Sequence, residues 1–463
     1  MKKYNIQLVK LPQPPKDCTG VPVMLTDETV QERVEKVLQG MEKRGLEQLI
    51  IYGDVEHSGN FKYLMGFFTR FEEALLIIRR DGNMTFMLGN ENLNKAEKAR
   101  VSGKAVHSSL FSLPNQPNRN DKTLRELLEE AGICPGVRTG IVGWKNFTSP
   151  VQDNKKMFDL PSFLMDEIRG IIGDVRLLSN ETDLFIGENG VRTTNNANEI
   201  AYYEYGASLA SDCLLEAMDK IVPGIKETDL GSLLNEGGQH PNIVTIAASG
   251  ERFIKANMFP TDNPVKIGDT ISLTVGYCGG SSSRAAYAVE EAGQLPEGVK
   301  GYLEQLAVPY FSAYIHWLEE IRIGMTGGEL FDKIEKILPR AEYHWSLCPG
   351  HLVAEEEWMS SPIYEGSKEM LRSGMLLQID IIPSIPGYGG CCAESTIALA
   401  DDALKEEIHL QYPDMWERMQ KRRSYITEYL GIALSPDVLP MCGTVAYFRP
   451  YMLQKDAALS VRH

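Results

Sequence analysis

Three short stretches decide the fold: Cys348-Pro-Gly-His351, Gly374-Met-Leu-Leu-Gln-Ile-Asp380 and Cys391-Cys-Ala-Glu394. Each ends in a side chain that can bind a divalent cation or transfer a proton. Each also lies at or near the edge of an apolar run that is typical of a β-strand. An acid such as Asp380 in such a run is costly to bury unless it is paired or bound to a metal. The three stretches therefore predict a site carried by neighbouring strands.

Length, charge and cysteine usage limit the classes of protein to which the chain can belong. Its 463 residues favour two domains, and a hydrophobic content of 43 % is enough for large cores. The net charge of −16 and the pI near 5.1 argue against nucleic acid or an anionic membrane surface as partner. The eight cysteines form no CxxC pair, so reduced thiols in a cytoplasmic protein are expected. The sequence shows neither a signal peptide nor a run approaching the roughly 20 apolar residues of a membrane span.

The first half of the chain alternates between helical and strand patterns. Apolar spacing and apolar runs predict a helix over Asp27 to about Gly45, a helix from Asn92, and strands at Leu49–Gly53, Ala74–Ile78, Met84–Leu88 and Thr139–Gly143. We therefore expect an α/β domain over residues 25–185.

The second half has an α+β pattern. A long helix from Glu199 to Ile221 is stopped by Pro223-Gly224, and a second helix ends near Leu233 to Gly238. Strands are predicted at 242–248, 270–277 and 284–289, and helices at 299–322, 328–338 and 402–429. We place this domain at 195–432. The apolar and aromatic extension 433–463 is expected to pack on the body or on a partner subunit.

Further landmarks come in the order, and at about the intervals, of a known family. They are Tyr63-Leu-Met-Gly66-Phe67, Glu199-Ile200, Ala248-Ser249-Gly250, Gly268-Asp269, Gly350-His351, Gly374-Met375 and Glu394. With them the chain resembles the creatinase, aminopeptidase P and prolidase family over about residues 28–430. The resemblance implies a creatinase-type α/β N-terminal domain and an α+β C-terminal domain with the pita-bread fold.

The resemblance also implies that metal ligands are missing here. Metal-dependent members hold two cations with two Asp, one His and two Glu. His351 and Glu394 match ligand positions, and Asp380 stands where the first Glu is usual. Thr274 falls at the first Asp, and the stretch 281–285, where the second belongs, contains no acid. We expect a degenerate site without a dinuclear centre, in which His351, Asp380 and Glu394 hold one Mn, Co or Zn ion at most, or none.

The same three residues are the candidate catalytic groups. Without a bridging metal, His351 is the predicted general base, and Asp380 or Glu394 orients its ring. A run of three glutamates and a tryptophan, Glu355–Trp358, follows His351. One of these carboxylates is expected to face substrate, although the sequence does not say which.

Three polar residues are candidates for substrate binding. Asn257 stands where the family has a histidine that contacts substrate in the peptidases and is the base in metal-free creatinase. Arg284 lies next to the run of serines at 281–283, and with Asn257 it predicts a pocket for a polar or anionic group. Arg70 is near the place of the creatinase arginine that grips a substrate carboxylate, and a solvated surface arginine is the alternative there.

Several thiols lie close in sequence to these groups: Cys278, Cys348, Cys391 and Cys392. A thiolate beside His351 would be a nucleophile. The alternative is that these cysteines are small buried hydrophobic residues.

Three functions stay open on the sequence. The first is a hydrolase of the creatinase or Xaa-Pro peptidase type, acting on a C–N bond of a small substrate or Xaa-Pro-like peptide. The second is a metal-free lyase on the same scaffold, and the third is a non-catalytic homologue with a binding or assembly role. Because members of this family are usually homodimers, the resemblance also implies a homodimer.

Overall fold

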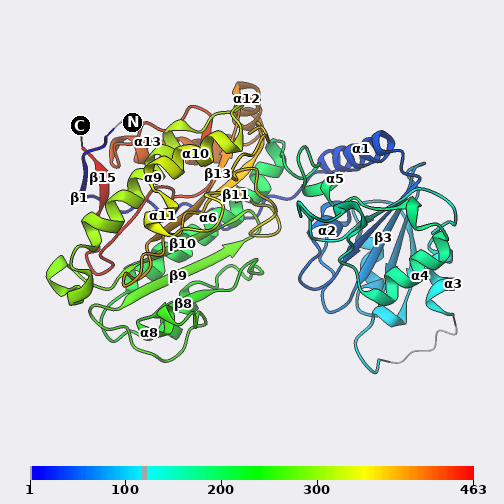
Figure 1. The fold of residues 1–463 in the computed structure, drawn as a ribbon, viewed down its shortest axis with the longest axis horizontal. Helices are drawn as coiled ribbons and strands as arrows, with labels where there is room; N and C mark the ends of the chain where they lie inside the picture. Colours follow the sequence, from blue (N-terminus) through cyan, green and yellow to red (C-terminus); the bar gives the residue numbers. More distant parts are fainter. Residues whose placement is uncertain (1–2, 117–121, 463) are drawn as a thin grey trace. The chain divides into compact units, whose positions relative to one another are not determined.

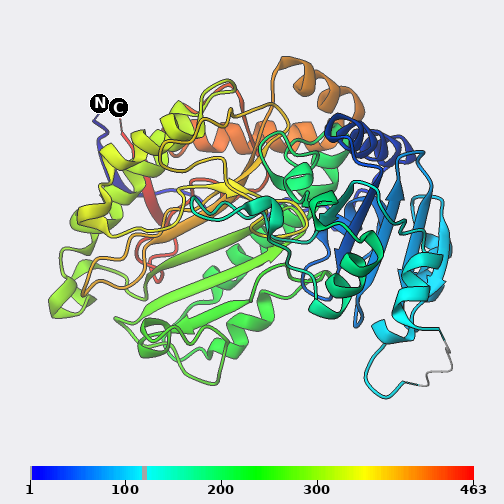
Figure 2. The same cartoon turned by 45° about the vertical axis from the view of Figure 1, so that its right-hand side comes forward.

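The computed structural model describes residues 3–116 and 122–462. The chain divides into two compact units, which Figures 1 and 2 show from two directions. The N-terminal unit is Leu25–Thr193, and the C-terminal unit combines Met1–Met24 with Thr194–His463. An α/β unit followed by an α+β unit confirms the predicted fold class. The first residues of the chain were not predicted to belong with the C-terminal unit.

The N-terminal unit is built on a mixed sheet in the order β5-β4-β3-β2-β6-β7. The pairs β2–β3 and β3–β4 are antiparallel, whereas β4–β5, β2–β6 and β6–β7 are parallel. The strands are β2 (Gln48–Gly53), β3 (Ala74–Arg79), β4 (Met84–Leu88), β5 (Lys104–His107), β6 (Thr139–Val142) and β7 (Leu178–Asn180). The helices are α1 (Asp27–Arg44), α2 (Gly59–Met65), α3 (Leu124–Glu130), α4 (Ser162–Ile172) and α5 (Asp183–Ile186).

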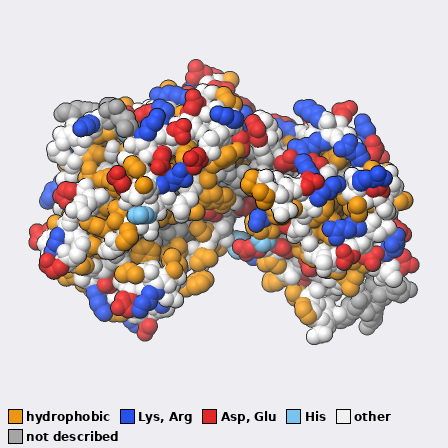
Figure 3. Space-filling view, viewed as in Figure 1, with side chains coloured by type: hydrophobic (Ala, Val, Ile, Leu, Met, Phe, Trp, Pro, Cys, Tyr) orange, Lys and Arg blue, Asp and Glu red, His pale blue; other side chains and the backbone are white. Residues whose placement is uncertain are grey.

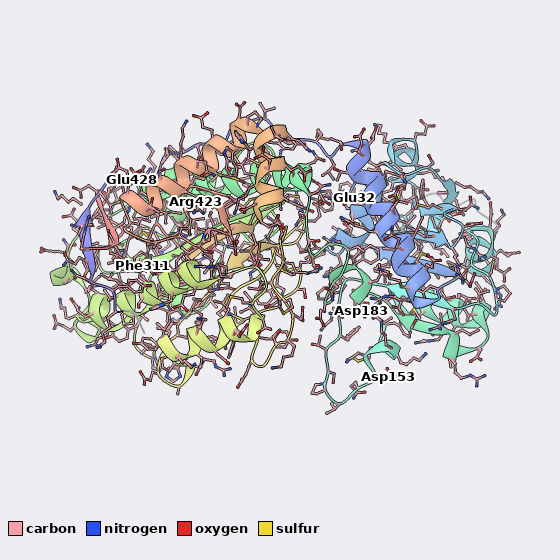
Figure 4. The ribbon with its side chains drawn as sticks, turned by 90° about the horizontal axis from the view of Figure 1, so that it is seen from above. Glu32, Asp153, Asp183, Phe311, Arg423 and Glu428 are labelled. Atoms are coloured by element: carbon pink, nitrogen blue, oxygen red, sulfur yellow. The ribbon has the colours of Figure 1, made fainter. Side chains whose placement is uncertain are left out.

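Local signals set the ends of α1. The Thr26 side chain accepts a hydrogen bond from Thr29 N–H at the start, and Gly45 takes the left-handed conformation at the end. Asp183, labelled in Figure 4, accepts from Arg44 of this helix at 2.6 Å and from Lys155 at 2.9 Å. The pair with Arg44 joins the start of α5 to the end of α1.

The C-terminal unit is built on an antiparallel sheet in the order β11-β12-β13-β10-β9-β8, with β14 paired to β13. Its strands are β8 (Ile246–Ser249), β9 (Thr270–Tyr277), β10 (Gly280–Tyr287), β11 (His351–Leu352), β12 (Leu376–Ile379), β13 (Cys392–Leu399) and β14 (Val438–Pro440). The long helix α6 (Ala197–Lys220) packs against β9 and β10. It approaches so closely that a Cβ on Gly206 would lie 2.0 Å from the Cys278 carbonyl oxygen.

The remaining helices of this unit are α7 (Glu227–Leu233), α8 (Glu251–Ile254), α9 (Val308–Glu320), α10 (Gly327–Ile337), α11 (Arg340–Tyr343), α12 (Asp402–Gln411) and α13 (Pro413–Glu428). The single helix predicted over 402–429 is therefore two helices. Pro413 begins the second, because it lacks the N–H needed to continue the first. Arg423 of α13, labelled in Figure 4, donates to the Ser435 carbonyl oxygen at 3.2 Å and so ties α13 to the segment before β14.

Both ends of the described chain pack on the C-terminal unit. Strand β1 (Ile6–Lys10) pairs antiparallel with β15 (Ala457–Val461), and the two lie side by side in Figures 1 and 2. Residues 433–463 thus cluster with this unit. None of the helices in the described ranges has the length and apolar character that crossing a membrane requires.

Candidate active site

The register of the central strands places four polar residues in one row. Ser283 of β10 pairs with Thr274 of β9 on one side and with Glu394 of β13 on the other. The pairing of β12 with β13 runs to Ile379 opposite Ser395, so the next residue, Asp380, stands level with Glu394. Residues directly opposite in antiparallel strands share one face of the sheet. Thr274, Ser283, Glu394 and Asp380 therefore cross that face side by side.

His351 joins the row from the neighbouring strand. It begins β11 and pairs with Gln378, two residues before Asp380 and hence on the same face. Its Nε2 lies 3.8 Å from Asp380 Oδ2. His351 is fully buried, and Asp380 and Glu394 are 5 % and 7 % exposed. The structure therefore brings the three predicted catalytic residues together.

A short loop covers His351. Leu352 and Ser360 are bridged, and Leu352 N–H donates to the Ser360 carbonyl oxygen at 2.7 Å, which closes the loop at its base. Glu357 reaches back so that its Oε1 lies 3.4 Å from His351 Nε2. The indole of Trp358 stacks on the imidazole, with ring centroids 4.1 Å apart. Of the three glutamates in this loop, Glu357 is thus the one that contacts His351.

Four ionisable side chains, those of His351, Glu357, Asp380 and Glu394, lie close together at this end of the sheet. Burial raises the pKa of Asp380 to about 6, and the charge of Glu357 adds to this effect while His351 opposes it. Burial raises the pKa of Glu394 well above its ordinary value, and the carboxylates of Asp380 and Glu357 raise it further. Burial alone would lower the pKa of His351, but Glu357 and Asp380 outweigh burial and raise it. We call His351, Glu357, Asp380 and Glu394 the acidic cluster.

The other half of the row, Thr274 and Ser283, is uncharged, and its hydroxyl groups are hydrogen-bonded. Thr274 Oγ1 and Ser283 Oγ are hydrogen-bonded to each other at 2.6 Å. The Cys392 thiol donates to Glu394 Oε1 at 2.9 Å. In contrast, His351 Nε2 and Asp380 Oδ1 are buried without a hydrogen-bond partner. Hydrogen-bonding capacity is therefore left over only toward the acidic end of this row.

These donors do not fit a two-cation centre. Two neutral hydroxyls, already bonded to each other, stand where a second ion would need carboxylates. Within residues 3–116 and 122–462, no group of three or more His, Cys, Asp or Glu side chains is arranged to hold a metal ion.

The structure does not bring Arg284 into the acidic cluster. It follows Ser283 in β10, so its side chain points to the opposite face of the sheet. The guanidinium donates to carbonyl oxygens of Tyr447 at 2.7 Å and of Glu394 at 2.8 Å, and also to that of Thr444. These bonds anchor the segment around Tyr447 to the sheet, which is a structural use of the charge.

The two other predicted substrate-binding residues lie outside helices and strands. Asn257 is exposed after α8, where its N–H donates to the Arg252 carbonyl oxygen at 2.8 Å. Arg70 belongs to the N-terminal unit, is half-buried, and accepts at its carbonyl oxygen from the Asn92 side chain. A role of either in binding stays a prediction.

The four cysteines near the cluster either donate a hydrogen bond from the thiol or pack as buried side chains. Burial raises the pKa of Cys348, Cys391 and Cys392, which disfavours the thiolate at each. Cys278 donates to Glu355 Oε2 at 2.8 Å and so joins the loop after His351 to the β9–β10 turn. These contacts agree better with structural cysteines than with a nucleophile.

Comparison with known proteins identifies the class. Residues 201–401 match metallopeptidase family M24. A Xaa-Pro dipeptidase of Pyrococcus horikoshii is 23 % identical over 264 residues, which are 55 % of this chain and 68 % of that protein. The Xaa-Pro dipeptidase structure from Bacillus anthracis superposes with a TM-score of 0.61 at 17 % identity, covering 81 % of this chain and 96 % of that one. The N-terminal domain of the FACT complex subunit SPT16 from Cicer arietinum gives 0.56 at 12 % identity, covering 82 % and 96 %.

The C-terminal unit, with its antiparallel sheet and the α6 helix packed on it, therefore has the pita-bread fold. The match to family M24, the dipeptidase relative and the structural likeness together confirm the resemblance drawn from the sequence. The chain therefore resembles the creatinase, aminopeptidase P and prolidase family, at an identity of 23 % to the dipeptidase relative.

Proposed function

We propose that this protein is a hydrolase that cleaves a C–N bond in a small substrate or an Xaa-Pro-like peptide, with at most one divalent cation. The observation that carries the proposal is the acidic cluster, in which His351 Nε2 and Asp380 Oδ1 are buried without a hydrogen-bond partner. Leaving such atoms unpaired costs free energy. A folded protein that retains them is best explained by a ligand or reacting group that completes them.

In this proposal His351 transfers the proton. The Leu352 carbonyl oxygen, 3.3 Å from Nδ1, accepts a hydrogen bond from Nδ1–H, so that the unprotonated Nε2 is the nitrogen that acts in the reaction. As general base, Nε2 takes a proton from water while the oxygen attacks the carbon of the C–N bond. The resulting imidazolium then protonates the leaving nitrogen. Glu357 and Asp380, at 3.4 and 3.8 Å, orient the ring and stabilise its charged form.

The test is the loss of turnover in His351→Ala. Hydrolysis of Xaa-Pro dipeptides and small amides should fall by about 10²–10⁴-fold, the usual contribution of a positioned acid–base group. The exposed His409 on α12 provides the matched control, and His409→Ala should keep full activity. Unchanged turnover in His351→Ala would remove the proposal. Products formed in ¹⁸O-water separate hydrolysis, which incorporates solvent oxygen, from a lyase reaction, which does not.

The metal content needs its own measurement. Elemental analysis of the purified protein, before and after incubation with Mn, Co or Zn, should find no more than one ion per chain. An ion that is lost in His351→Ala would belong to the cluster. Two ions per chain would show that the Thr274–Ser283 pair does not prevent a second cation from binding.

A non-catalytic binding or assembly role is the second candidate. The neutral hydroxyl pair in place of carboxylates supports it, as does the likeness in fold to a protein whose name describes it as a complex subunit. Saturable turnover that is abolished by Glu394→Gln would exclude this candidate.

The oligomeric state and location are proposed on the family resemblance. We propose a homodimer, which light scattering of the purified protein should show as about twice the chain mass. On the visible face, Figure 3 shows acidic and basic side chains intermixed over both units. A cytoplasmic location stays a prediction.

A further inference from the structure

The proposed general base has no exposed surface. His351 is fully buried, and the neighbouring Asp380 and Glu394 are only 5 % and 7 % exposed. A general base must come within hydrogen-bond reach of the proton that it takes. Part of the protein must therefore move before a substrate can reach His351 Nε2.

The loop that follows β11 supplies side chains that cover the imidazole. Glu357 Oε1 lies 3.4 Å from Nε2, and the Trp358 indole is stacked on the ring at 4.1 Å, with the two planes 19° apart. We call residues 353–359 the cover loop, and Glu357 with Trp358 its tip. The Glu357 side chain is 15 % exposed and Trp358 is 39 % exposed. The tip therefore lies between the buried imidazole and solvent.

The first part of the cover loop is anchored to the sheet, whereas the tip is not. Val353 N–H donates to the Leu376 carbonyl oxygen at 3.2 Å, and the Ala354 carbonyl oxygen accepts from Gly279 N–H at 2.7 Å. Across the described residues, the tip joins no backbone–backbone hydrogen bond, and its one ion pair and one ring stack are both with His351. Segments with so few bonds open locally at a low free-energy cost. The tip can therefore leave the imidazole while the strands stay paired.

We propose that the tip is a gate, which covers the His351 imidazole in the resting protein and swings away to admit substrate. The substrate in this statement rests on the proposed function, whereas the movement is inferred from the cover loop itself. In the closed state Glu357 occupies the space beside Nε2 that the substrate or the attacking water needs, so the two compete. Trp358 covers the face of the ring and keeps bulk water from it. Because only the open state is competent, the open fraction scales the apparent affinity for substrate.

Acylation of histidines by diethyl pyrocarbonate, located by mass spectrometry, measures the gate without any substrate. In the full chain at about pH 8, His351 should react at least tenfold more slowly than the exposed His409. Trp358→Ala should raise the rate at His351 at least tenfold, because it removes the cover and leaves the charges in place. Trp144→Ala is the matched control and should leave that rate unchanged, since Trp144 is 44 % exposed and stacks on a different imidazole, that of His57, at 4.3 Å.

The wild type distinguishes a gate from a fixed cover. Local opening exposes little surface, so the rate at His351 should change little with urea below the unfolding transition. The buried His316 of α9 reports global unfolding, and its rate should rise steeply with urea. Reaction of His351 only in step with His316 would overturn the inference, because the cover would then be fixed. Reaction of wild-type His351 as fast as His409, or no change of its rate in Trp358→Ala, would overturn it as well.

The gate and the hydrolase proposal can fail separately, because the acylation needs no turnover. If His351 reacts as expected and the wild type hydrolyses nothing, the gate holds and the hydrolase proposal fails. Turnover in a protein whose His351 reacts only on global unfolding gives the reverse result. Trp358→Leu, which keeps apolar volume but not the flat ring, gives the same test if Trp358→Ala does not fold.

Discussion

The Ser283→Asp substitution tests whether the acidic cluster is as crowded with negative charge as the structure indicates. Ser283 is the β10 residue directly opposite Glu394, and its hydroxyl is bonded to Thr274. The substitution places a third carboxyl group in the row, beside those of Glu394 and Asp380. It also supplies a carboxylate at the stretch where the family resemblance expects the second metal-binding aspartate.

The expected cost follows from the register. Directly opposite residues in antiparallel strands have Cβ atoms about 4.5–5.5 Å apart. Two negative charges about 5.5 Å apart, at an effective dielectric constant of about 20, repel by about 3 kcal/mol. If Glu394 is protonated instead, the repulsion is replaced by the free energy needed to keep Glu394 protonated in the folded variant. The substitution then also lowers the free energy of unfolding. We expect Ser283→Asp to lower the free energy of unfolding by about 3 kcal/mol relative to Ser283→Asn.

The asparagine variant is the matched control, because it has nearly the same volume and also loses the hydroxyl pair. Urea unfolding at pH 7.5, followed by tryptophan fluorescence, to which the buried Trp317 in α9 contributes, measures both variants. Mn²⁺ should then stabilise Ser283→Asp and leave Ser283→Asn unaffected. A ligand at 100 times its Kd adds about 2.7 kcal/mol, which would recover most of the loss.

Two results would refute this reasoning. If Ser283→Asp and Ser283→Asn unfold within about 0.5 kcal/mol of each other, the carboxylates are not crowded and the electrostatic account of the cluster fails. If Mn²⁺ stabilises the wild type as much as Ser283→Asp, the hydroxyl pair does not prevent metal binding. The conclusion that these donors cannot hold a second cation would then be wrong.

Two further predictions concern the network that holds the N-terminal segment on the C-terminal unit. Arg422, whose side chain is almost fully buried, pairs with Asp17 and Glu204, so Arg422→Met should cost about 3–5 kcal/mol in urea unfolding. Lys421→Met, which removes an exposed pair on the same helix, should cost less than about 0.5 kcal/mol. Burial raises the pKa of Asp212 to about 6, above the unfolded value of about 3.9, so the native state binds this proton more tightly. Stability from this group should therefore fall as pH rises from about 4 to 6, and urea unfolding of Asp212→Asn should lack that component.

Most of the fold could be predicted from the sequence, because local patterns determine it. The apolar spacing after Asp27 and the apolar runs around residues 48–53 and 270–277 produce the helix and strands expected of them. The errors arose where a single residue overrides a pattern. Pro413 divides the predicted closing helix, and the helix predicted from Asn92 is only a short 3-10 helix over Leu93–Lys98. The pairing of β1 with β15 joins residues more than 440 positions apart, and no local signal marks it.

The candidate site was predictable only in part, for a geometric reason. His351, Asp380 and Glu394 could be identified from the sequence, because each is an ionisable residue at or near the edge of an apolar run. The opposite orientations of Ser283 and Arg284 depend on the strand register, and a shift of one residue exchanges the two faces. Glu357 was one of three adjacent glutamates, and only the folded loop shows that it is the one facing His351.

The two halves of the polar row argue against simple decay of an ancestral metal site. The hydroxyl half satisfies itself, with Thr274 and Ser283 bonded to each other. The carboxyl half does not, because burial and mutual repulsion raise the pKa of both Asp380 and Glu394. Replacing buried charged groups by well-packed neutral ones often stabilises a protein by about 1–4 kcal/mol. A protein that does not use such charged groups would therefore become more stable by losing them. A chain that has neutral groups in one half and acids in the other is best explained by a ligand that still requires the acids.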